Sequence, residues 1–322
     1  MPLRGSKAER APRHRASRHA LGQYREVVIV LTAAAVGLTA RGALSWLVNH
    51  EGINVLLAIL VFATATAMDP RSLRELPQLW RRGGLALLAG VTLLPALSFL
   101  ASRLVASGAL RDGVMTTGLA PCEIASIATT AIAGGNVAAA GGVLLGSTLL
   151  TVTLGGPILA LEAHHSSVHP GAIIANLLLV VALPFALALG LRFRSTLSAR
   201  QETGAATTST LAVAGLVALI ASEVHLTLDY FGIAGALLAF LMASIILGVL
   251  LGRGAGAPTS NALLLTTSMR DFAIAAGLAS AAFGPRSAAP LGLYGIMVLT
   301  WGMGCAGYLR AKSNRPTPPA PA

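Results

Sequence analysis

The chain has 322 residues, of which 55% are hydrophobic and 11% are charged, and its mean hydropathy is +0.74. A typical soluble domain carries about 25% charged residues, so this composition excludes a soluble protein. The apolar stretches are long and continuous, whereas a membrane β-barrel needs short alternating segments. We therefore expect an all-α integral membrane protein with many crossings.

Apolar stretches long enough to cross about 30 Å of hydrocarbon recur along the whole chain. Ten of them begin near residues 26, 53, 83, 113, 137, 171, 205, 233, 261 and 290. Residues 1–25 are polar and basic and residues 310–322 are rich in proline, so neither segment has the apolar surface to fold alone. Nine stretches follow the first, which predicts a retained helix rather than a cleaved signal. Residues 69–82 predict a short interfacial helix with Trp80 at headgroup depth.

The formal net charge of +11 is consistent with a nucleic-acid partner, but the distribution of the cations favours an orientation signal. With a cytoplasmic N-terminus, 18 of the 23 Lys and Arg residues lie on the cytoplasmic side, as the positive-inside rule requires. We therefore expect a multi-pass protein of the inner (cell) membrane with both termini in the cytoplasm. Residues 1–25 are expected to contact anionic lipid, and no nucleic-acid partner is expected.

The ten stretches divide into two sets of five, residues 26–162 and residues 171–309. An odd number of crossings in each set means that the two sets insert in opposite orientations, as in inverted-repeat transporters. The first stretches of the two sets start 145 residues apart, near 26 and 171, and the fourth stretches start 148 apart, near 113 and 261. The sequence therefore predicts two inverted five-helix repeats, each with charged residues at the same place.

The first charged segment is LAPCEIAS, in which Cys122 and Glu123 follow Pro121. Proline lacks an amide hydrogen and clashes with the preceding turn, so the helix should kink or open there. An opened segment would offer its backbone groups to a solute. A charge at mid-bilayer depth costs about 2.5–3.5 kcal/mol on insertion scales, so Glu123 is expected to pair or to face a cavity. The alternative is a simple proline kink with Glu123 bonded to a neighbouring helix.

The second charged segment, residues 261–283, carries a polar patch in an apolar run. The patch consists of Thr266, Thr267, Ser268, Arg270 and Asp271. The segment has no proline, and no glycine before Gly277, so an opening is less clearly predicted here. Adjacent residues do not face each other on an intact helix. If the segment opens or the halves cross, we expect Arg270 to meet Glu123. The alternative is a purely structural ion pair, whose loss would leave an unpaired buried charge.

Three stretches resemble the bile acid:sodium symporter family. LAPCEIASIATTAIAGGNVAAAGGVLLGSTLL, with a turn at Gly135 and Asn136, resembles the first crossing-helix region, and TSMRDFAIAAGLASAAFG resembles the second. VFATATAMDPRSLRELPQLWRRGGLALLAGVTLLPAL is similar to the second and third spans. The resemblance covers about residues 26–310 and implies a divergent, bacterial-type member. It implies ten helices in a panel domain (first, second, sixth and seventh spans) and a core domain. Two broken helices would cross at the substrate site, with alternating access between the domains.

This chain departs from the family at the positions of the sodium ligands. In the sodium-coupled members the second crossing segment supplies a carboxylate and then a Gln-Asn pair, and the matching residues here are Thr266, Arg270 and Asp271. The Ser-Asn pair that follows the proline turn in those members is matched by Ser126 and Ile127. A hard cation needs several oxygen ligands, and a guanidinium repels sodium, so the sequence argues against sodium coupling.

We expect Arg270 to replace the bound cation, with Glu123 or Asp271 as its counter-ion and a proton as the candidate coupling ion. No cofactor is expected, because the chain has no nucleotide-binding loop. His164, His165 and His169 cluster in a loop without a fixed geometry, so no metal site is expected.

The sequence predicts a secondary active transporter of an organic anion, with steroid, keto acid and vitamin-precursor anions all open. The expected substrate-binding and coupling residues are Pro121, Cys122, Glu123, Ser126, Asn136, Thr266, Thr267, Ser268, Arg270 and Asp271. Asn136 is also expected to cap the turn before the fifth span. Cys122 resembles a cysteine of the related arsenite efflux permeases, so export of arsenite or another oxyanion is an alternative, and a non-transporting sensor is another. An enzyme is not expected, because no nucleophile–base pair accompanies the charges. The sequence leaves the oligomeric state open.

Overall fold

The computed structural model describes residues 28–29, 31–67, 80–106, 108–163, 170–195, 197–224 and 229–313. Over these ranges the chain is built from helices, and the one β-type pairing within them is an isolated bridge. Several predicted features lie outside the described residues. They are the basic tail 1–25, residues 69–79 of the interfacial helix, His164, His165 and His169, and residues 314–322 of the Pro-rich tail.

The first half begins with a helical segment, Leu31–Thr39, which meets α2 (Arg41–Asn49) at a bend of 96°. It continues with α3 (Gly52–Ala67), α4 (Trp80–Val91), α5 (Leu93–Ser102), α6 (Gly108–Thr116), α7 (Ala125–Ile132) and α8 (Val137–Ala163).

The second half begins with α9 (Pro170–Leu177), a π-helical turn η3 (Leu178–Ala182) and α10 (Leu183–Arg194), which together form one long helix. It continues with α11 (Ala199–Ser222), α12 (Asp229–Gly252), α13 (Ala257–Ser268), α14 (Phe272–Phe283), the 3₁₀ turn η4 (Pro285–Ala288) and α15 (Ala289–Ser313).

Six helices of the described chain are long and apolar enough to cross a membrane, and a seventh is added if the bent pair Leu31–Thr39 and Arg41–Asn49 counts as one span. The six are Arg81–Ser102, Val137–Leu161, Gly171–Arg194, Arg200–Ser222, Tyr230–Gly252 and Pro285–Ser313. The remaining apolar stretches form shorter helices, and two of them, near residues 113 and 261, are interrupted close to their charged residues. The chain is thus a multi-pass membrane protein, and the count of ten crossings stays a prediction.

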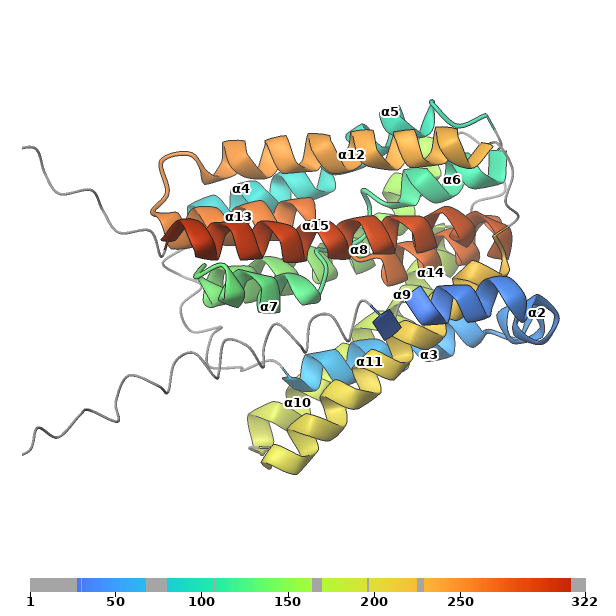
Figure 1. Ribbon diagram of the computed structural model, residues 1–322, viewed down its shortest axis with the longest axis horizontal. Helices are drawn as coiled ribbons and strands as arrows, with labels where there is room; N and C mark the ends of the chain where they lie inside the picture. Colours follow the sequence, from blue (N-terminus) through green and yellow to red (C-terminus); the bar gives the residue numbers. More distant parts are fainter. Residues whose placement is uncertain are drawn as a thin grey trace, which may run out of the picture.

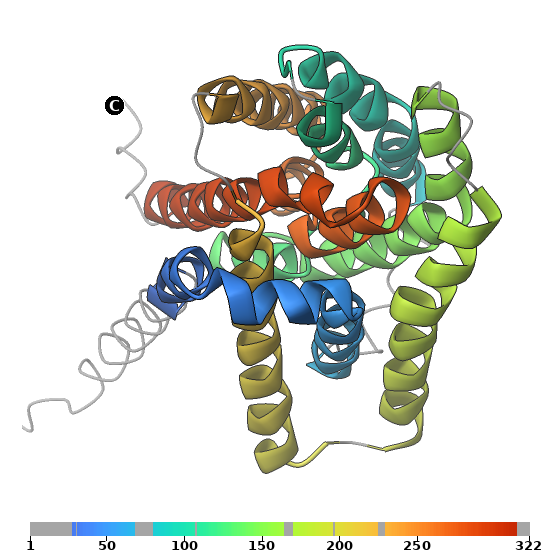
Figure 2. The same cartoon turned by 90° about the vertical axis from the view of Figure 1, so that its right-hand side faces the viewer.

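The helices form two groups (Figures 1 and 2). In one group, α3 packs against α10 and α11, and α2 packs against α11. The other group contains α4 to α8 and α12 to α15, with α12 beside α13 and α8 beside α4. The two groups contact each other where α8 meets α9, where α14 meets α3 and α9, and where α15 meets α11. Both α14 and α15 therefore belong to the larger group and border the smaller one.

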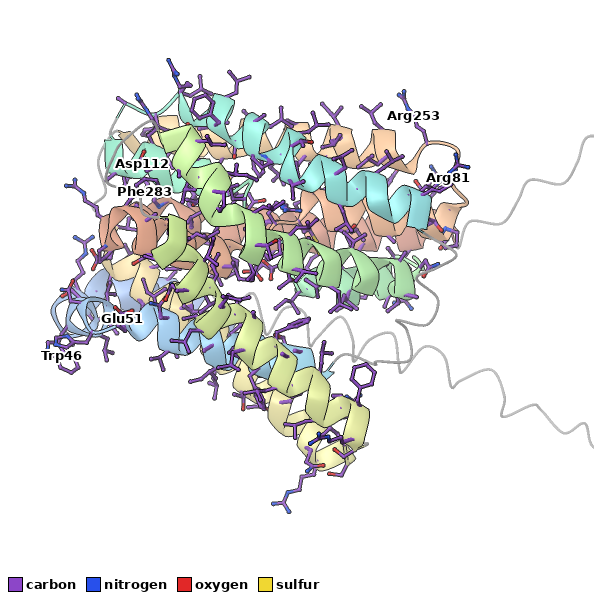
Figure 3. The ribbon with its side chains drawn as sticks, turned by 180° about the vertical axis from the view of Figure 1, so that it is seen from behind. Trp46, Glu51, Arg81, Asp112, Arg253 and Phe283 are labelled. Carbon is purple, nitrogen blue, oxygen red and sulfur yellow. The ribbon has the colours of Figure 1, made fainter. Side chains whose placement is uncertain are left out.

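The outer surface and the two ends differ in chemistry. Large apolar side chains point outward along the helices, such as Leu161, Phe231 and Leu100, which are 75%, 80% and 67% exposed. An exposed apolar surface of this extent is typical of contact with lipid. Arg81 and Arg253 lie at one end of the molecule, and Trp46, Glu51, Asp112 and Phe283 lie at the other (Figure 3).

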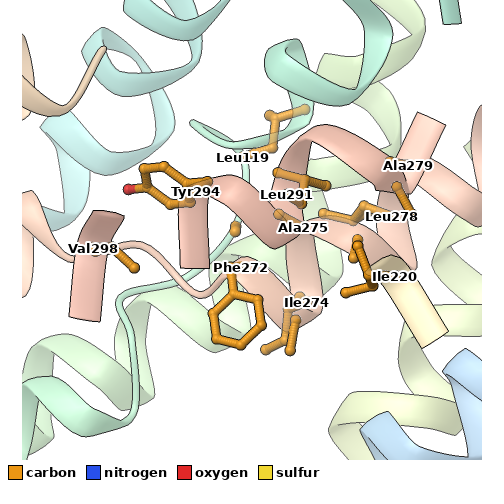
Figure 4. Packing of buried hydrophobic residues seen from close by; sticks show 14 of the residues in the cluster. Leu119, Ile220, Phe272, Ile274, Ala275, Leu278, Ala279, Leu291, Tyr294 and Val298 are labelled. Carbon is orange, nitrogen blue, oxygen red and sulfur yellow. The ribbon is translucent and has the colours of Figure 1, made fainter. Parts of the chain in front are cut away.

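The centre of the larger group is α14, whose residues Phe272 to Ala279 are all buried. A helix that is apolar all round is expected in a core. Phe272, Leu278 and other α14 side chains pack against Leu291, Tyr294 and Val298 of α15 (Figure 4). The N-terminus of α14 is thereby held deep inside the molecule, and Asp271 and Arg270 precede it directly.

Candidate substrate site at the two interrupted helices

The first interruption lies between α6 and α7, where residues 117–124 are not helical. The chain opens around Pro121, rather than merely bending, and α8 bonds the freed backbone groups. Ser147 accepts a hydrogen bond from the Cys122 amide at 3.1 Å, and Thr151 donates one to the Leu119 carbonyl at 2.9 Å. Non-helical backbone at membrane depth is stable only with such partners.

The second interruption lies between α13 and α14 and consists of Met269, Arg270 and Asp271. Met269 (φ −97°, ψ 108°) and Asp271 (φ −71°, ψ 104°) have extended backbones. Asp271 is the N-cap of α14, because its carboxylate accepts a hydrogen bond from the Ile274 amide at 2.8 Å. An aspartate directly before an apolar run is a recognised N-cap signal, so the sequence indicates a helix start at this break even without a proline.

The two interruptions pair with each other as a short antiparallel bridge. The Glu123 amide donates to the Met269 carbonyl at 2.8 Å, and the Asp271 amide donates to the Pro121 carbonyl at 2.9 Å. Cys122 and Arg270 lie opposite each other between these bonds, as a non-hydrogen-bonded pair. Residues 123 and 271 are 148 positions apart, and so are residues 121 and 269. This is the separation predicted for the fourth stretches of the two halves. Exchanging the two halves therefore turns one hydrogen bond into the other.

Arg270 is 3% exposed and extends from the bridge toward α4. Its guanidinium donates to the Ala120 carbonyl. Its Nη atoms lie 3.9 and 4.0 Å from the position that a Cβ would occupy on Gly90. Its Nε atom is buried and has no hydrogen-bond partner. The charge is thus held by backbone oxygen and retains an unused donor.

Arg270 and Glu123 both lie in the described part of the chain, and the predicted ion pair between them is not formed. The reason is the alternation of side chains along extended backbone. Arg270 shares one face of the bridge with Cys122, whereas Glu123 and Asp271 belong to the other face. The two carboxylates are close enough to repel each other, and the Glu123 carboxylate lies beside the amides of Ile124, Ala125 and Phe272.

Glu123 is 8% exposed, and its Oε2 atom accepts no hydrogen bond. Asp271 is 1% exposed and is occupied by the cap of α14. The site therefore contains one buried cation and two buried carboxylates, of which one has a free oxygen.

Most other predicted residues lie near this bridge. Ser126 donates to the Cys122 sulfur over 3.9 Å. Thr266 donates back to its own helix at Ala262, and Ser268 donates to Leu264 and accepts from the indole of Trp301 at 2.9 Å. Thr267 is buried, and its hydroxyl has no partner.

Asn136 is the exception, because its side chain accepts from the Ala139 amide at 3.0 Å and caps the start of α8. The predicted capping role is confirmed. Asn136 lies on the turn that follows α7, so the structure does not bring its side chain to the bridge.

Three further buried hydroxyls near the two interruptions have no hydrogen-bond partner and were not predicted. They belong to Thr117 at the start of the first interruption, Thr130 on α7 and Tyr294 on α15. Leaving a buried hydroxyl unbonded costs about 1–3 kcal/mol, so such groups are available to a polar solute. A polar tyrosine within an apolar span could have identified Tyr294 from the sequence. Nothing in the local sequence distinguishes Thr117 or Thr130 from threonines that bond to their own helix.

In the described part of the chain, no three His, Cys, Asp or Glu side chains gather closely enough to hold a metal ion. The arrangement can instead bind a solute through a fixed guanidinium, free hydroxyls and opened backbone. Ser126 and Thr266 donate hydrogen bonds within the protein and keep their oxygen lone pairs, whereas Ser268 both donates and accepts.

Comparisons with known proteins agree with this picture. Residues 54–232, more than half of the chain, match the sodium bile acid symporter family. This match includes the first interruption and ends before the second. An uncharacterized sodium-dependent transporter of Bacillus subtilis (strain 168), YocS, is 24% identical over 284 residues, which cover 83% of this chain and 85% of that protein.

Proposed function

The chain belongs to the sodium bile acid symporter family, and from this premise we propose that it is a secondary active transporter of a small organic anion. The observation that carries the proposal is Arg270, a cation buried at the junction of two interrupted helices. An ionisable residue at membrane depth marks a solute pathway by default. A fixed guanidinium with an unused donor suits a carboxylate or sulfonate, which accepts hydrogen bonds from it.

The proposed architecture is two inverted repeats of five helices, with ten crossings in total. The paired hydrogen bonds 123→269 and 271→121 support this symmetry, since each bond maps onto the other when the halves are exchanged. The small group of α2, α3, α9, α10 and α11 corresponds to a panel domain, and the larger group corresponds to a core domain. Alternating access would then come from movement of one group against the other, around the bridge.

The proposed orientation places both termini in the cytoplasm of a cell whose inner membrane holds the protein. Arg81 and Arg253 lie at one end of the molecule, which supports a cytoplasmic assignment for that end. Lipid and the transported anion are the expected partners, and neither nucleic acid nor a cofactor is part of the proposal.

Sodium coupling is the competing hypothesis, because the Bacillus relative is named as sodium-dependent. We propose that this chain differs, with Arg270 as a permanent substitute for the coupling cation. Arg270 and Asp271 stand where sodium-coupled members have a Gln-Asn pair, and Thr266 stands where they have a carboxylate. A guanidinium held in this position repels a second cation within a few ångströms.

Export of arsenite is the second candidate, and the position of Cys122 opposite Arg270 is the observation in its favour. A Cys122→Ser variant separates the two functions. It should abolish arsenite resistance of cells if the thiol binds metalloid, and it should leave organic-anion uptake measurable if the guanidinium binds the substrate.

The decisive experiment is uptake into proteoliposomes of a panel of steroid, keto acid and vitamin-precursor anions, under separate sodium and proton gradients. We expect uptake of at least one anion without sodium, and its loss in Arg270→Gln. Arg270→Lys keeps the charge and should retain part of the uptake. Strictly sodium-dependent uptake that is indifferent to Arg270→Gln would overturn the proposal, and no uptake of any anion would favour a non-transporting sensor.

A further inference from the structure

The two carboxylates of the site are not equivalent, although they occupy corresponding positions of the bridge. Asp271 is committed to structure, because its Oδ1 atom accepts from the Ile274 amide at 2.8 Å and begins α14. Its side chain is also the more deeply buried of the two. Any change of its charge would act on the start of a fully buried helix.

Glu123 is less committed, because only one of its two carboxylate oxygens can be engaged by the protein. The N-cap residue of α7 is Ile124, whose side chain makes no cap hydrogen bond, and Glu123 Oε2 is buried without a partner. The carboxylate lies between the N-termini of α7 and α14, beside the amides of Ile124 and Phe272. It is thus the carboxylate with a free oxygen at the meeting point of the two halves.

The charges of the site limit what can bind there. Arg270 supplies one positive charge, and Glu123 and Asp271 supply two negative charges when both are ionised. The N-termini of α7 and α14 add about half a positive charge each, so the empty site is close to neutral. A bound monoanion then leaves one negative charge uncompensated in a medium of low dielectric constant. One proton on Glu123 removes this excess.

We propose that Glu123 is the proton carrier of this transporter, and that it takes up one proton with each monoanion bound. This inference rests on the proposed function and names its coupling ion. On one side of the membrane, a proton adds to a Glu123 carboxylate oxygen while the anion binds near Arg270. On the other side the O–H bond breaks, and the proton and the anion leave together, so no net charge crosses.

The titratable groups around Glu123 are compatible with this role. Asp271 faces it from the start of α14, and Cys122 precedes it on the bridge. Tyr294 approaches from α15, and its hydroxyl has no hydrogen-bond partner. Arg270 lies on the opposite face of the bridge, so it does not hold Glu123 in a permanent ion pair.

The test uses the purified full-length protein in proteoliposomes. Taurocholate is the first probe, because its sulfonate stays ionised over the pH range and pH cannot act on the probe itself. Pyruvate is the carboxylate probe. Accumulation is measured at a fixed internal pH while the external pH is lowered, with sodium absent, and the charge moved is recorded on a solid-supported membrane.

For the wild type we expect an accumulation ratio that rises about tenfold for each pH unit, without current. Glu123→Gln resembles the protonated carboxyl, so it should still exchange the anion across the membrane. It should lose pH-driven accumulation and move charge with the anion. Asp271→Asn should keep the tenfold rise, because asparagine also caps a helix and Glu123 is unchanged. It should slow uptake, because the charge at the start of α14 is lost. Glu202→Gln, on the exposed start of α11, is the matched carboxylate control and should behave as the wild type.

Several outcomes overturn the inference while leaving organic-anion transport intact. They are accumulation that follows sodium instead of pH, wild-type uptake that carries current, and unchanged pH dependence in Glu123→Gln. Loss of pH dependence in Asp271→Asn alone would transfer the role to that residue. If the wild type takes up no anion of the panel, the proposed function fails and this inference fails with it.

Discussion

Cys122 and Arg270 face each other across the backbone bridge that joins the two interrupted helices, although 147 residues lie between them in the sequence. Each is buried, and each belongs to a different half of the protein. The Cα atoms of such a non-hydrogen-bonded antiparallel pair are about 4.5 Å apart, which is within the range for a disulfide. The pairing can therefore be tested by chemistry.

We predict that Arg270→Cys forms a disulfide with Cys122 under mild oxidation. The experiment is made in a Cys305→Ser background, so that Cys122 is the single native thiol. Counting of free thiols with a maleimide should fall from two to none after oxidation and return to two after reduction. The control Thr266→Cys lies one turn earlier on α13 and should keep both thiols free. Efficient crosslinking in the control instead would contradict the register of the bridge.

Gly90 is predicted to be the residue that makes room for the Arg270 guanidinium. A Cβ there would lie 3.9 Å from Nη1, an ordinary van der Waals contact, so Gly90→Ala should fold and transport nearly as the wild type. Gly90→Leu extends into the volume of the guanidinium, and overpacking of this kind costs about 1–3 kcal/mol. We expect lower thermal stability and loss of uptake in Gly90→Leu. Equal behaviour of the two variants would show that the guanidinium is not held against α4.

Asp271 is predicted to be needed for stability through its cap of α14. Asp271→Ala removes the acceptor for the Ile274 amide, and loss of an N-cap costs about 1 kcal/mol. Asp271→Asn retains an acceptor and should lose less. The measurement is the thermal unfolding midpoint in detergent, at several pH values. The cap role is wrong if alanine and asparagine lower the midpoint equally.

The first interruption could be predicted from the sequence because proline has a local effect: Pro121 removes an amide hydrogen wherever it stands in a helix. The second has no proline and no nearby glycine, and its local signal is Asp271 before an apolar run, which marks a helix N-cap as well as a buried charge. The family could be predicted because its motifs extend over long stretches of sequence, and the all-helical membrane class could be predicted from composition.

The partner of Arg270 was predicted wrongly because the pairing of two extended segments is a tertiary event. Once Cys122 and Arg270 face each other, alternation moves Glu123 to the other face. The roles of Gly90 and Tyr294 depend in the same way on helices that meet only in the folded protein. Residue type alone does not show which face of an extended segment a side chain will occupy.

The last prediction concerns the end of α13, which Trp301 of α15 holds through a hydrogen bond from its indole nitrogen to Ser268 Oγ at 2.9 Å. Trp301→Phe removes the donor and keeps most of the ring, so it should lower stability by about 0.5–1.5 kcal/mol. Ser268→Ala removes the acceptor and should cost a similar amount.

Because both variants remove the same bond, the double variant should be less destabilised than the sum of the two single variants. Unfolding midpoints of the four proteins give this coupling, and Trp46→Phe, at an exposed position on α2, is the control for loss of an indole. Strictly additive effects would mean that the bond does not contribute. A coupled pair would mean that α15 fixes the residue two positions before Arg270, and so helps to set the direction of the guanidinium at the substrate site.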